Sequence, residues 1–322
     1  MSESGDYEPQ DWGTGTSFAD ARAAYDADAG RSYDEAKARG VTASDVLPES
    51  LSTQSTKPFI VVPDLTGSMS DRPGVMFGKM PYMWNEIEKE YLGSDAEVAF
   101  VGVQDDGDNY PLQAQPFGQG EDLRVALAKL VIEGGGQGSL GRHERYDAAA
   151  LYLCRNVQMP RAIRPTVIFI GDEEPYPNIN PGLALRMAKV TIPKSMTVEE
   201  VFSELKRKYD VYFILGPYGR FAREVSEDID STTRGIQRAW NKILGDDHVS
   251  LLTDASRIVD VIFGILAEVS GRRTYFEKEI ADRQTPAQVK TVMKSLATVH
   301  KIGGEPERKR LKGASRLKGE DA

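Results

Sequence analysis

The sequence predicts an α/β fold in which helices cover both faces of a mostly parallel central β-sheet. Short segments such as Phe59–Val62 and Arg164–Gly171 are rich in β-branched and aromatic residues, as is typical of strands buried on both faces of a parallel sheet. Strand and helix patterns alternate from Phe59 to Val269, and this alternation requires crossover connections between parallel strands. The 322 residues suffice for one large α/β domain with extensions, or for two small domains.

The N-terminal extension, residues 1–56, has few large aliphatic side chains and many Gly, Ser, Asp and Thr residues. Such a segment buries too little apolar area to order by itself, so we expect it to be partly disordered or to dock on a partner. Packing on its own domain is an equally open alternative, because the segment contains several aromatic residues. These are Trp12, Phe18, Tyr25 and Tyr33.

Three further parts follow this extension. Residues 57–271 form the α/β domain, and residues 272–302 form two helices divided at Thr285-Pro286, with Thr285 as the N-cap and proline at the first helical position. An apolar stripe on these C-terminal helices packs either on the same domain or on a neighbouring subunit. Residues 303–322 are rich in Lys and Arg and are expected to form a basic disordered tail.

The first half of the domain has clear element boundaries. Met76–Tyr91 has helical spacing interrupted by glycine and proline, Asp95–Val103 is the second strand, and Tyr110–Phe117 returns as a proline-broken edge strand. Asp105–Asn109, between those strands, lacks the D-x-D-x-D-G spacing of a calcium loop and is predicted to be a solvated hairpin turn. Glu121–Val131 is an amphipathic helix with an acidic first turn.

The second half continues the alternation. A helical pattern resumes at about Glu144, and Thr197–Tyr209 begins with a capping box and forms an amphipathic helix. His248 is expected at the surface edge of the last strand. The remaining predicted elements are a short helix over 183–189, a strand over 210–216, a helix over 232–244, a strand over 248–252 and a buried helix over 256–269.

Three oxygen-bearing side chains follow the first strand directly. Asp64, Thr66 and Ser68 lie at i, i+2 and i+4 on a glycine-containing turn, at the strand end where open α/β sheets bind ligands. Hard divalent cations prefer oxygen ligands, so this turn is a candidate metal site. The alternative is a capped turn, because the same residue types satisfy free backbone N–H groups.

A matching carboxylate follows the strongest strand of the chain. Asp172 comes directly after Arg164–Gly171, and Glu173 and Glu174 follow it. Charged residues directly after a buried strand indicate its functional end. The three acidic residues are expected to favour cations or basic partner surfaces at this rim.

The D-x-T-x-S pattern of Asp64, Thr66 and Ser68 resembles the first motif of the metal-ion-dependent adhesion site (MIDAS) in von Willebrand factor A (vWA) domains. Asp172 resembles the third motif, although Glu173 stands where the family usually has glycine. The resemblance covers Phe59–Val269. It implies a Rossmann-like vWA fold and a site for Mg²⁺, or for Ca²⁺ or Mn²⁺.

The second motif of the family is incomplete in this chain. The glycine-rich loop at residues 134–138 is present, but the threonine that should follow it is absent. Glu144 is the preferred substitute, with Ser139 and His143 as alternatives. A glutamate here brings another full negative charge to the ion and weakens the need for a partner carboxylate. In the competing interpretation no side chain replaces the threonine, and Glu144 caps the helix.

The resemblance implies a divalent-metal-dependent protein–protein interaction module that acts as a scaffold or adaptor in an intracellular assembly. In the family the ion keeps one position open for a partner carboxylate, and intracellular bacterial and phage members act with partners such as ATPases. Self-assembly through the terminal arms is a further expectation. The alternatives are a structural subunit with a degenerate metal site, or a metal-dependent phosphoester hydrolase with Glu173 or Glu174 as base.

Composition excludes several other classes of protein. The single cysteine, Cys154, allows no intramolecular disulfide and no CxxC metal cluster. There is no signal-peptide or membrane-span pattern at the N-terminus or elsewhere, so we expect a cytoplasmic protein. The net charge of −9 argues against general nucleic-acid binding. The glycine-rich loop lacks the P-loop Lys-Ser/Thr pair, which disfavours nucleotide binding.

Overall fold

The computed structural model describes residues 33–66, 69, 71–132, 143–218 and 229–299. Ser68, Ser139 and most of the N-terminal aromatic residues fall outside these ranges, as does the basic tail. Predictions made for them therefore have no structural description.

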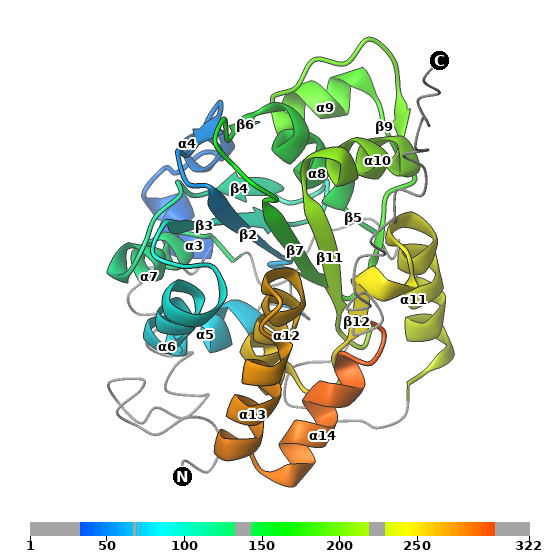
Figure 1. The fold of residues 1–322 in the computed structure, drawn as a ribbon. Coiled ribbons are helices and arrows are strands. Elements are labelled where there is room, and N and C mark those ends of the chain that lie inside the picture. The colour runs from blue at the N-terminus through cyan, green and yellow to red at the C-terminus, as the bar shows by residue number, and fades with distance from the viewer. Residues whose placement is uncertain (1–32, 67–68, 70, 133–142, 219–228, 300–322) are drawn as a thin grey trace, which may run out of the picture.

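A six-stranded sheet in the order β12-β11-β7-β2-β3-β4 forms the centre of the protein (Figure 1). All neighbouring pairs are parallel except β3 with the edge strand β4. Counted along the chain, this is the doubly wound order, whose direction reverses between β2 and β7. The predicted α/β class is thus confirmed. The strands are β2 (Lys57–Pro63), β3 (Ala96–Val103), β4 (Leu112–Ala114), β7 (Thr166–Gly171), β11 (Asp210–Leu215) and β12 (Val249–Leu251).

Side chains of β2 alternate between two separate hydrophobic cores. Phe59 and Val61 join the core on one face of the sheet, whereas Ile60 and Val62 join the core on the other. All four are fully buried. A strand covered on both faces has no polar side to show, which explains its uninterrupted apolar sequence.

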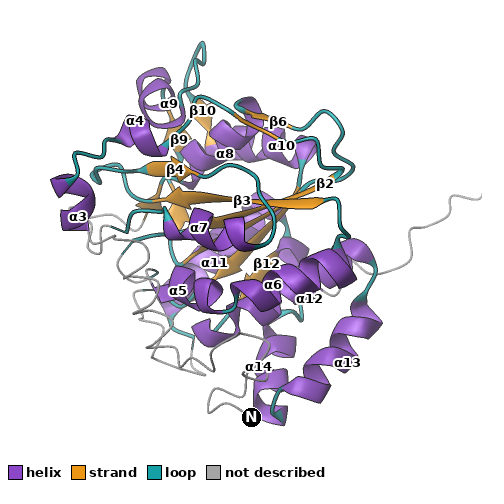
Figure 2. Ribbon diagram, turned by 90° about the vertical axis from the view of Figure 1, so that its left-hand side faces the viewer, coloured by secondary structure: helices purple, strands orange, loops and turns teal. Residues whose placement is uncertain are grey.

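Helices cover both faces, as expected from the crossover connections. Figure 2 shows α8, α9 and α10 on one side of the sheet, and α5, α6 and α12 on the other. The first-face helices are α5 (Asp71–Gly78), α6 (Met80–Glu86), the π-helical turn Ile87–Tyr91, α7 (Glu121–Ala128) and α12 (Ile258–Ser270). The second-face helices are α8 (Tyr146–Arg155), α9 (Pro181–Ala188), α10 (Val198–Lys208) and α11 (Ser231–Leu244).

The C-terminal helices α13 (Arg273–Arg283) and α14 (Pro286–Ser295) pack on the same domain. Val292, Leu296 and Val299 are fully buried and belong to the first-face core. Thr285 is the N-cap of α14 and Pro286 follows it, as predicted. The structure adds a capping box, in which Thr285 accepts the Gln288 amide. The described part of the apolar stripe therefore packs on the same domain.

The described part of the N-terminal extension also lies against the domain. It contains α3 (Tyr33–Ala38), α4 (Ala43–Val46) and β1 (Leu51–Ser52), which pairs with β6 (Val157–Gln158). Ala36 and Val46 share a small core with Tyr110, whose hydroxyl donates to the Val41 carbonyl at 2.8 Å. Residues 33–56 thus pack on their own domain.

Several predicted boundaries and positions need correction. Helix α7 ends at Ala128 rather than Val131, and Lys129 is its C-cap. His248 precedes β12 in a short 3₁₀ turn and is half-buried. Its ring stacks on Tyr212, and its Nδ1 lies 2.8 Å from the Val211 carbonyl oxygen. It therefore packs between elements instead of lying at a free strand edge.

Candidate metal centre

Asp64 and Asp172 follow neighbouring strands at the point where the strand order reverses. Pro63 pairs with Ile170 in the β2–β7 ladder, and the Asp64 amide donates to the Ile170 carbonyl at 2.8 Å. Both aspartates are fully buried. Their proximity follows from the sheet itself, because parallel strands bring their carboxyl ends to one edge.

The carboxylate of Asp64 is held by hydrogen bonds on both oxygens. Oδ1 accepts from the Thr66 amide at 2.8 Å and from the Thr66 hydroxyl at 2.6 Å. Oδ2 accepts from the Tyr146 hydroxyl at 2.9 Å. Because the Thr66 hydroxyl hydrogen points at Asp64, the lone pairs of its oxygen face elsewhere and are available to a cation.

Within the described ranges, no set of three or more His, Cys, Asp or Glu side chains forms a group that could hold a metal ion by itself. A metal site here therefore needs hydroxyl oxygen in addition to carboxylates. Thr66 offers one hydroxyl beside Asp64. Ser68, the second predicted hydroxyl, lies outside the described residues.

Glu144 does not begin a helix, contrary to the sequence prediction. It lies in the two-residue strand β5 (His143–Glu144), which pairs in parallel with β8 (Glu174–Pro175) just after Asp172. The N-cap of α8 is Arg145, without a side-chain cap hydrogen bond. Glu144 is only 4% exposed, and its buried Oε2 has no hydrogen-bond partner among the described residues.

Burial raises the pKa values of two carboxyl groups in this region, those of Asp64 and Glu144. Burial, followed by the charge of Asp172, raises the pKa of Asp64 to about 7, although hydrogen bonds from Thr66 and Tyr146 oppose the shift. Burial also raises the pKa of Glu144 well above its usual value, and the charges of Asp64 and Glu173 add to it. A bound cation would relieve both effects, because it compensates the charge that burial penalises.

The loop after β3 differs from the solvated turn that was predicted. Asp105 is only 5% exposed and accepts a hydrogen bond from the Tyr176 hydroxyl at 2.8 Å. Arg145 lies 3.7 Å above the Tyr176 ring and pairs with Asp106 at 3.3 Å and with Asp147 at 3.0 Å. The loop is thus held against β5 and α8, next to Glu144.

The contact of Tyr146 with Asp64 was not predicted from the sequence. This side chain is fully buried among Phe169, Phe213 and Trp240, and only its hydroxyl reaches Asp64. A Cβ atom on Gly171 would lie 1.7 Å from that hydroxyl oxygen. Glycine just before Asp172, at the end of a buried strand, was the signal of this close approach.

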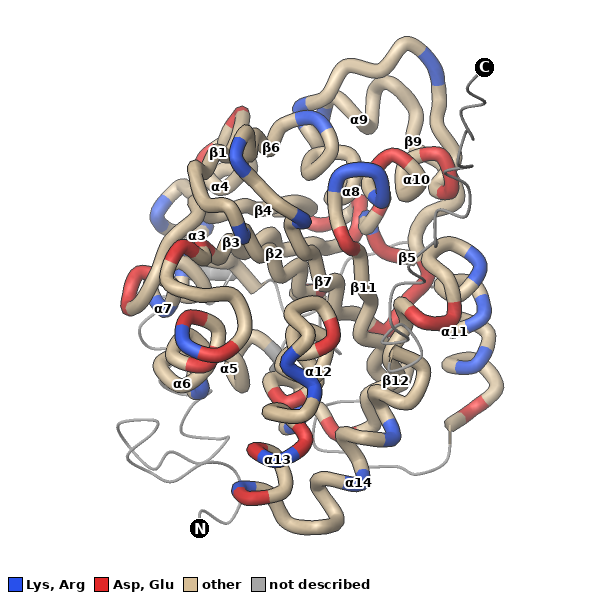
Figure 3. Tube along the Cα trace, in the orientation of Figure 1, with Lys and Arg blue, Asp and Glu red and all other residues tan. Residues whose placement is uncertain are grey.

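Glu173 and Glu174 are both half-buried rather than fully solvated. The Glu173 carbonyl accepts from the Trp240 indole at 2.9 Å, and Glu174 lies in β8 opposite His143. Over the described chain, Lys and Arg positions are scattered among Asp and Glu positions (Figure 3). Every described helix is too short or too polar to cross a bilayer.

The donor types at this edge of the sheet are those that hard divalent cations prefer, although the described carboxylates do not by themselves form a group that could hold an ion. Asp64, Asp172 and Glu144 supply carboxylates and Thr66 a hydroxyl, and the Oε2 atom of Glu144 is buried without a hydrogen-bond donor among the described residues. Buried charged oxygens need a compensating partner. Oxygen-only donor sets of this kind suit Mg²⁺, Ca²⁺ or Mn²⁺.

Neither protein-family models nor curated proteins match this chain. Among solved structures, proximal thread matrix protein 1 from the mussel byssus is 13% identical, with a TM-score of 0.43 over 68% of this chain and 49% of that chain. Another structure of that protein, with a zinc-occupied MIDAS motif, is 14% identical, with a TM-score of 0.42 over 68% of this chain and 48% of that chain. The pilus adhesin SpaC from Lactobacillus rhamnosus GG is 12% identical, with a TM-score of 0.45 over 70% of this chain and 31% of that chain. This chain thus spans about half of the mussel protein and about a third of the adhesin.

Proposed function

We propose that this protein is a divalent-metal-dependent protein–protein interaction module. In this proposal Asp64, Thr66, Asp172 and Glu144, together with Ser68, hold the ion. The observation that carries it is the buried Oε2 atom of Glu144, which has no hydrogen-bond partner among the described residues. It belongs to a carboxyl group whose pKa is raised by burial and by the charge of Asp64.

A bound ion would supply positive charge at the switch point of the sheet. The chain's own residues do the positioning. The β2–β7 ladder sets Asp64 beside the strand that leads to Asp172, Thr66 and Tyr146 fix the Asp64 carboxylate, and the β5–β8 pairing brings in Glu144. The scaffold or adaptor role in an intracellular assembly follows from the vWA resemblance of the sequence and remains part of the proposal.

The test is a thermal and urea unfolding series on metal-stripped protein to which Mg²⁺, Mn²⁺ or Ca²⁺ is added back. At about 100 times its Kd, a bound ion adds roughly 2.7 kcal/mol to the free energy of unfolding. Asp172→Asn and Glu144→Gln keep the shape of each side chain and remove its charge. Both variants should lose most of that increment.

The matched control is Asp210→Asn. Asp210 is the first residue of β11, so it lies at the amino-terminal ends of the parallel strands, away from Asp64 and Asp172. Its carboxylate pairs with Arg164 at 2.6 Å. This variant should retain the full response to metal. If no ion stabilises the wild type, or if Asp172→Asn and Glu144→Gln respond like the wild type, the metal site does not exist.

The interaction half of the proposal needs a separate comparison. Immobilised wild type with Mg²⁺, wild type with a chelator, and Asp172→Asn with Mg²⁺ should differ in the proteins that they retain. A partner bound under the first condition alone supports the proposal. Equal retention by all three samples would argue for a scaffold that works without the ion.

A further inference from the structure

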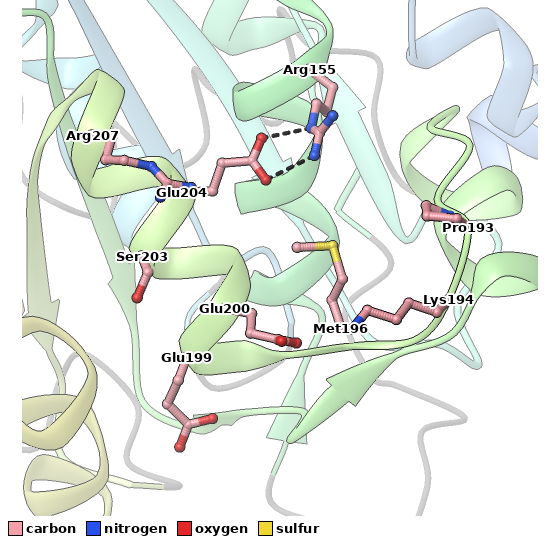
Figure 4. Close-up of a pocket in the computed structure, with 9 residues that line it drawn as sticks. All are labelled: Arg155, Pro193, Lys194, Met196, Glu199, Glu200, Ser203, Glu204 and Arg207. Carbon is pink, nitrogen blue, oxygen red and sulfur yellow. Dashed lines mark hydrogen bonds and ion pairs between the residues drawn. The ribbon is translucent and has the colours of Figure 1, made fainter.

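A second candidate binding site lies on the opposite end of α8 from Glu144. It is an open pocket of about 470 Å³ between α10, the C-terminal end of α8 and the loop before β10 (Met196–Thr197) (Figure 4). Its size is in the range of ligand pockets. Its charged lining residues are Arg155, Lys194, Glu199, Glu200, Glu204 and Arg207.

The walls of this pocket are fixed by interactions within the chain. Arg155 and Glu204 form a two-point ion pair, with Nε to Oε1 at 2.6 Å and Nη2 to Oε2 at 2.9 Å. Met196 pairs with Ile179 of β9 (Asn178–Ile179) in the β9–β10 ladder, and Thr197 next to it caps α10 by accepting the Glu200 amide. The loop and the helix are therefore held on either side of the pocket before any ligand arrives.

All three acidic side chains of the lining are already engaged. Glu204 pairs with Arg155, and Glu199 pairs at 3.0 Å with Lys242 of α11. Glu200 accepts the Thr197 amide at 2.8 Å. Two of the three carboxylates, Glu199 and Glu204, are therefore compensated by cations of the chain itself.

Two basic side chains of the lining are in the opposite situation. Lys194 and Arg207 are exposed, and neither has an ion-pair partner among the described residues. Figure 4 shows Lys194 on the loop and Arg207 on α10, on opposite sides of the pocket, with the Met196 side chain projecting between them. Glu200 keeps its negative charge because its partner, the Thr197 amide, is neutral. The two unpaired cations of the lining therefore exceed the unpaired carboxylates by one, and they flank an apolar surface made by Met196 and Pro193.

We propose that this pocket binds an acidic peptide segment of a partner protein, with an apolar side chain seated on Met196 and carboxylates facing Lys194 and Arg207. Methionine suits such a role, because its flexible and polarizable thioether adapts to different apolar side chains. Carboxylates on lysine and arginine make charge-assisted hydrogen bonds. The site is separate from the candidate metal centre and does not depend on an ion.

The test follows the methyl signal of Met196 by NMR in protein labelled at the methionine methyl groups. Met196→Leu identifies the signal. The probes are a peptide of alternating Glu and Leu, a peptide of alternating Lys and Leu of equal length, and inorganic phosphate. We expect saturable movement of the Met196 signal with the Glu-Leu peptide alone.

Charge removal then tests the recognition. Lys194→Gln and Arg207→Gln should each weaken binding of the Glu-Leu peptide by about twofold to fivefold, as expected for the loss of one solvent-exposed ion pair. The matched control Lys278→Gln/Lys290→Gln removes two exposed charges from α13 and α14 on the other face of the sheet, and it should bind like the wild type.

Three results would overturn the proposal. Equal movement of the Met196 signal with both peptides would mean nonspecific apolar binding. No movement with either peptide would mean that the pocket does not bind peptides. The same response to phosphate alone would make it a small-anion site instead of a peptide site.

Discussion

At the residue scale, Tyr146 joins the candidate metal centre to the hydrophobic core. Its ring packs edge-on against Phe213 and Trp240, and its hydroxyl donates to Asp64 Oδ2 at 2.9 Å. Burial raises the pKa of this hydroxyl well above its ordinary value, so it stays a proton donor throughout the physiological pH range. Outer contacts of this kind orient a metal ligand and tune its affinity.

Tyr146→Phe should therefore weaken metal binding while leaving the fold intact. Loss of an oriented hydrogen bond to a ligand lowers metal affinity about 10- to 100-fold in other metal sites. The measurement is an Mg²⁺ titration followed by thermal stability. A Tyr146→Phe protein with wild-type affinity for Mg²⁺ would show that Tyr146 only fills space.

Tyr152→Phe is the matched control for this prediction. Tyr152 lies on the same helix, and its hydroxyl donates to the Pro48 carbonyl at 3.0 Å, away from the carboxylates. Its removal should lower the free energy of unfolding by about 1 kcal/mol without changing the affinity for Mg²⁺. An equal loss of affinity in both variants would mean that general destabilisation of α8, rather than the contact with Asp64, explains the effect.

At the scale of elements, the contact between α12 and α14 depends on one glycine. A Cβ atom on Gly264 of α12 would lie 2.1 Å from Leu296 Cδ1 and 2.9 Å from its Cδ2. Leu296 is fully buried, so it cannot turn away into solvent. We expect Gly264→Ala to lower the free energy of unfolding by about 1–3 kcal/mol, the usual range for overpacking a core.

Gly235→Ala makes the same change in a helix without the crowding. Gly235 lies inside α11, and no neighbouring heavy atom is within 4 Å of its added Cβ. Alanine should therefore stabilise the protein by about 0.5–1 kcal/mol, because it has the higher helix propensity. Urea unfolding of both variants checks the pair. If Gly264→Ala and Gly235→Ala change stability by similar amounts and with the same sign, then α14 can shift to accommodate the added methyl group, and close packing of Gly264 on Leu296 is not needed.

Elements that carry their own local signal were predictable from the sequence. The capping boxes at Thr197 and Thr285 start helices where the sequence placed them, and Asp64 follows a strand whose apolar run is continuous. Those features depend on neighbours in the chain. Once β2 and β7 are neighbouring parallel strands, Asp64 and Asp172 must lie near each other, because each follows the carboxyl end of its strand.

Features made by distant segments were not predictable in this way. Strand β5 forms only because Glu144 pairs with Pro175, and a two-residue strand has no periodicity of its own. Asp105 is buried because Tyr176, from the loop after β7, donates to it. The pattern of acidic residues in the sequence indicates solvent exposure, and only tertiary contacts reverse that expectation.

At the scale of the whole molecule, the buried carboxylates couple stability to pH and to metal. In the metal-free protein the pKa of Asp64 is raised from 3.8 to about 7, so between these values the folded state holds a proton that the unfolded state has released. Stability therefore falls as pH rises through this window. Glu144, whose pKa is also raised, contributes in the same direction.

A bound divalent cation should reverse this dependence, because it binds the ionised carboxylates and competes with protons. The increase in the free energy of unfolding caused by Mg²⁺ should thus be small near about pH 5 and larger near about pH 8. Urea unfolding with and without Mg²⁺ at several pH values measures both slopes. Asp64→Asn should reduce the metal-free slope, to which Glu144 and Asp147 with their raised pKa values also contribute, and should remove most of the Mg²⁺ increment. A metal-free protein whose stability rises from about pH 4 to about pH 7 would contradict the electrostatic description of the site, since the folded state would then hold fewer protons than the unfolded chain.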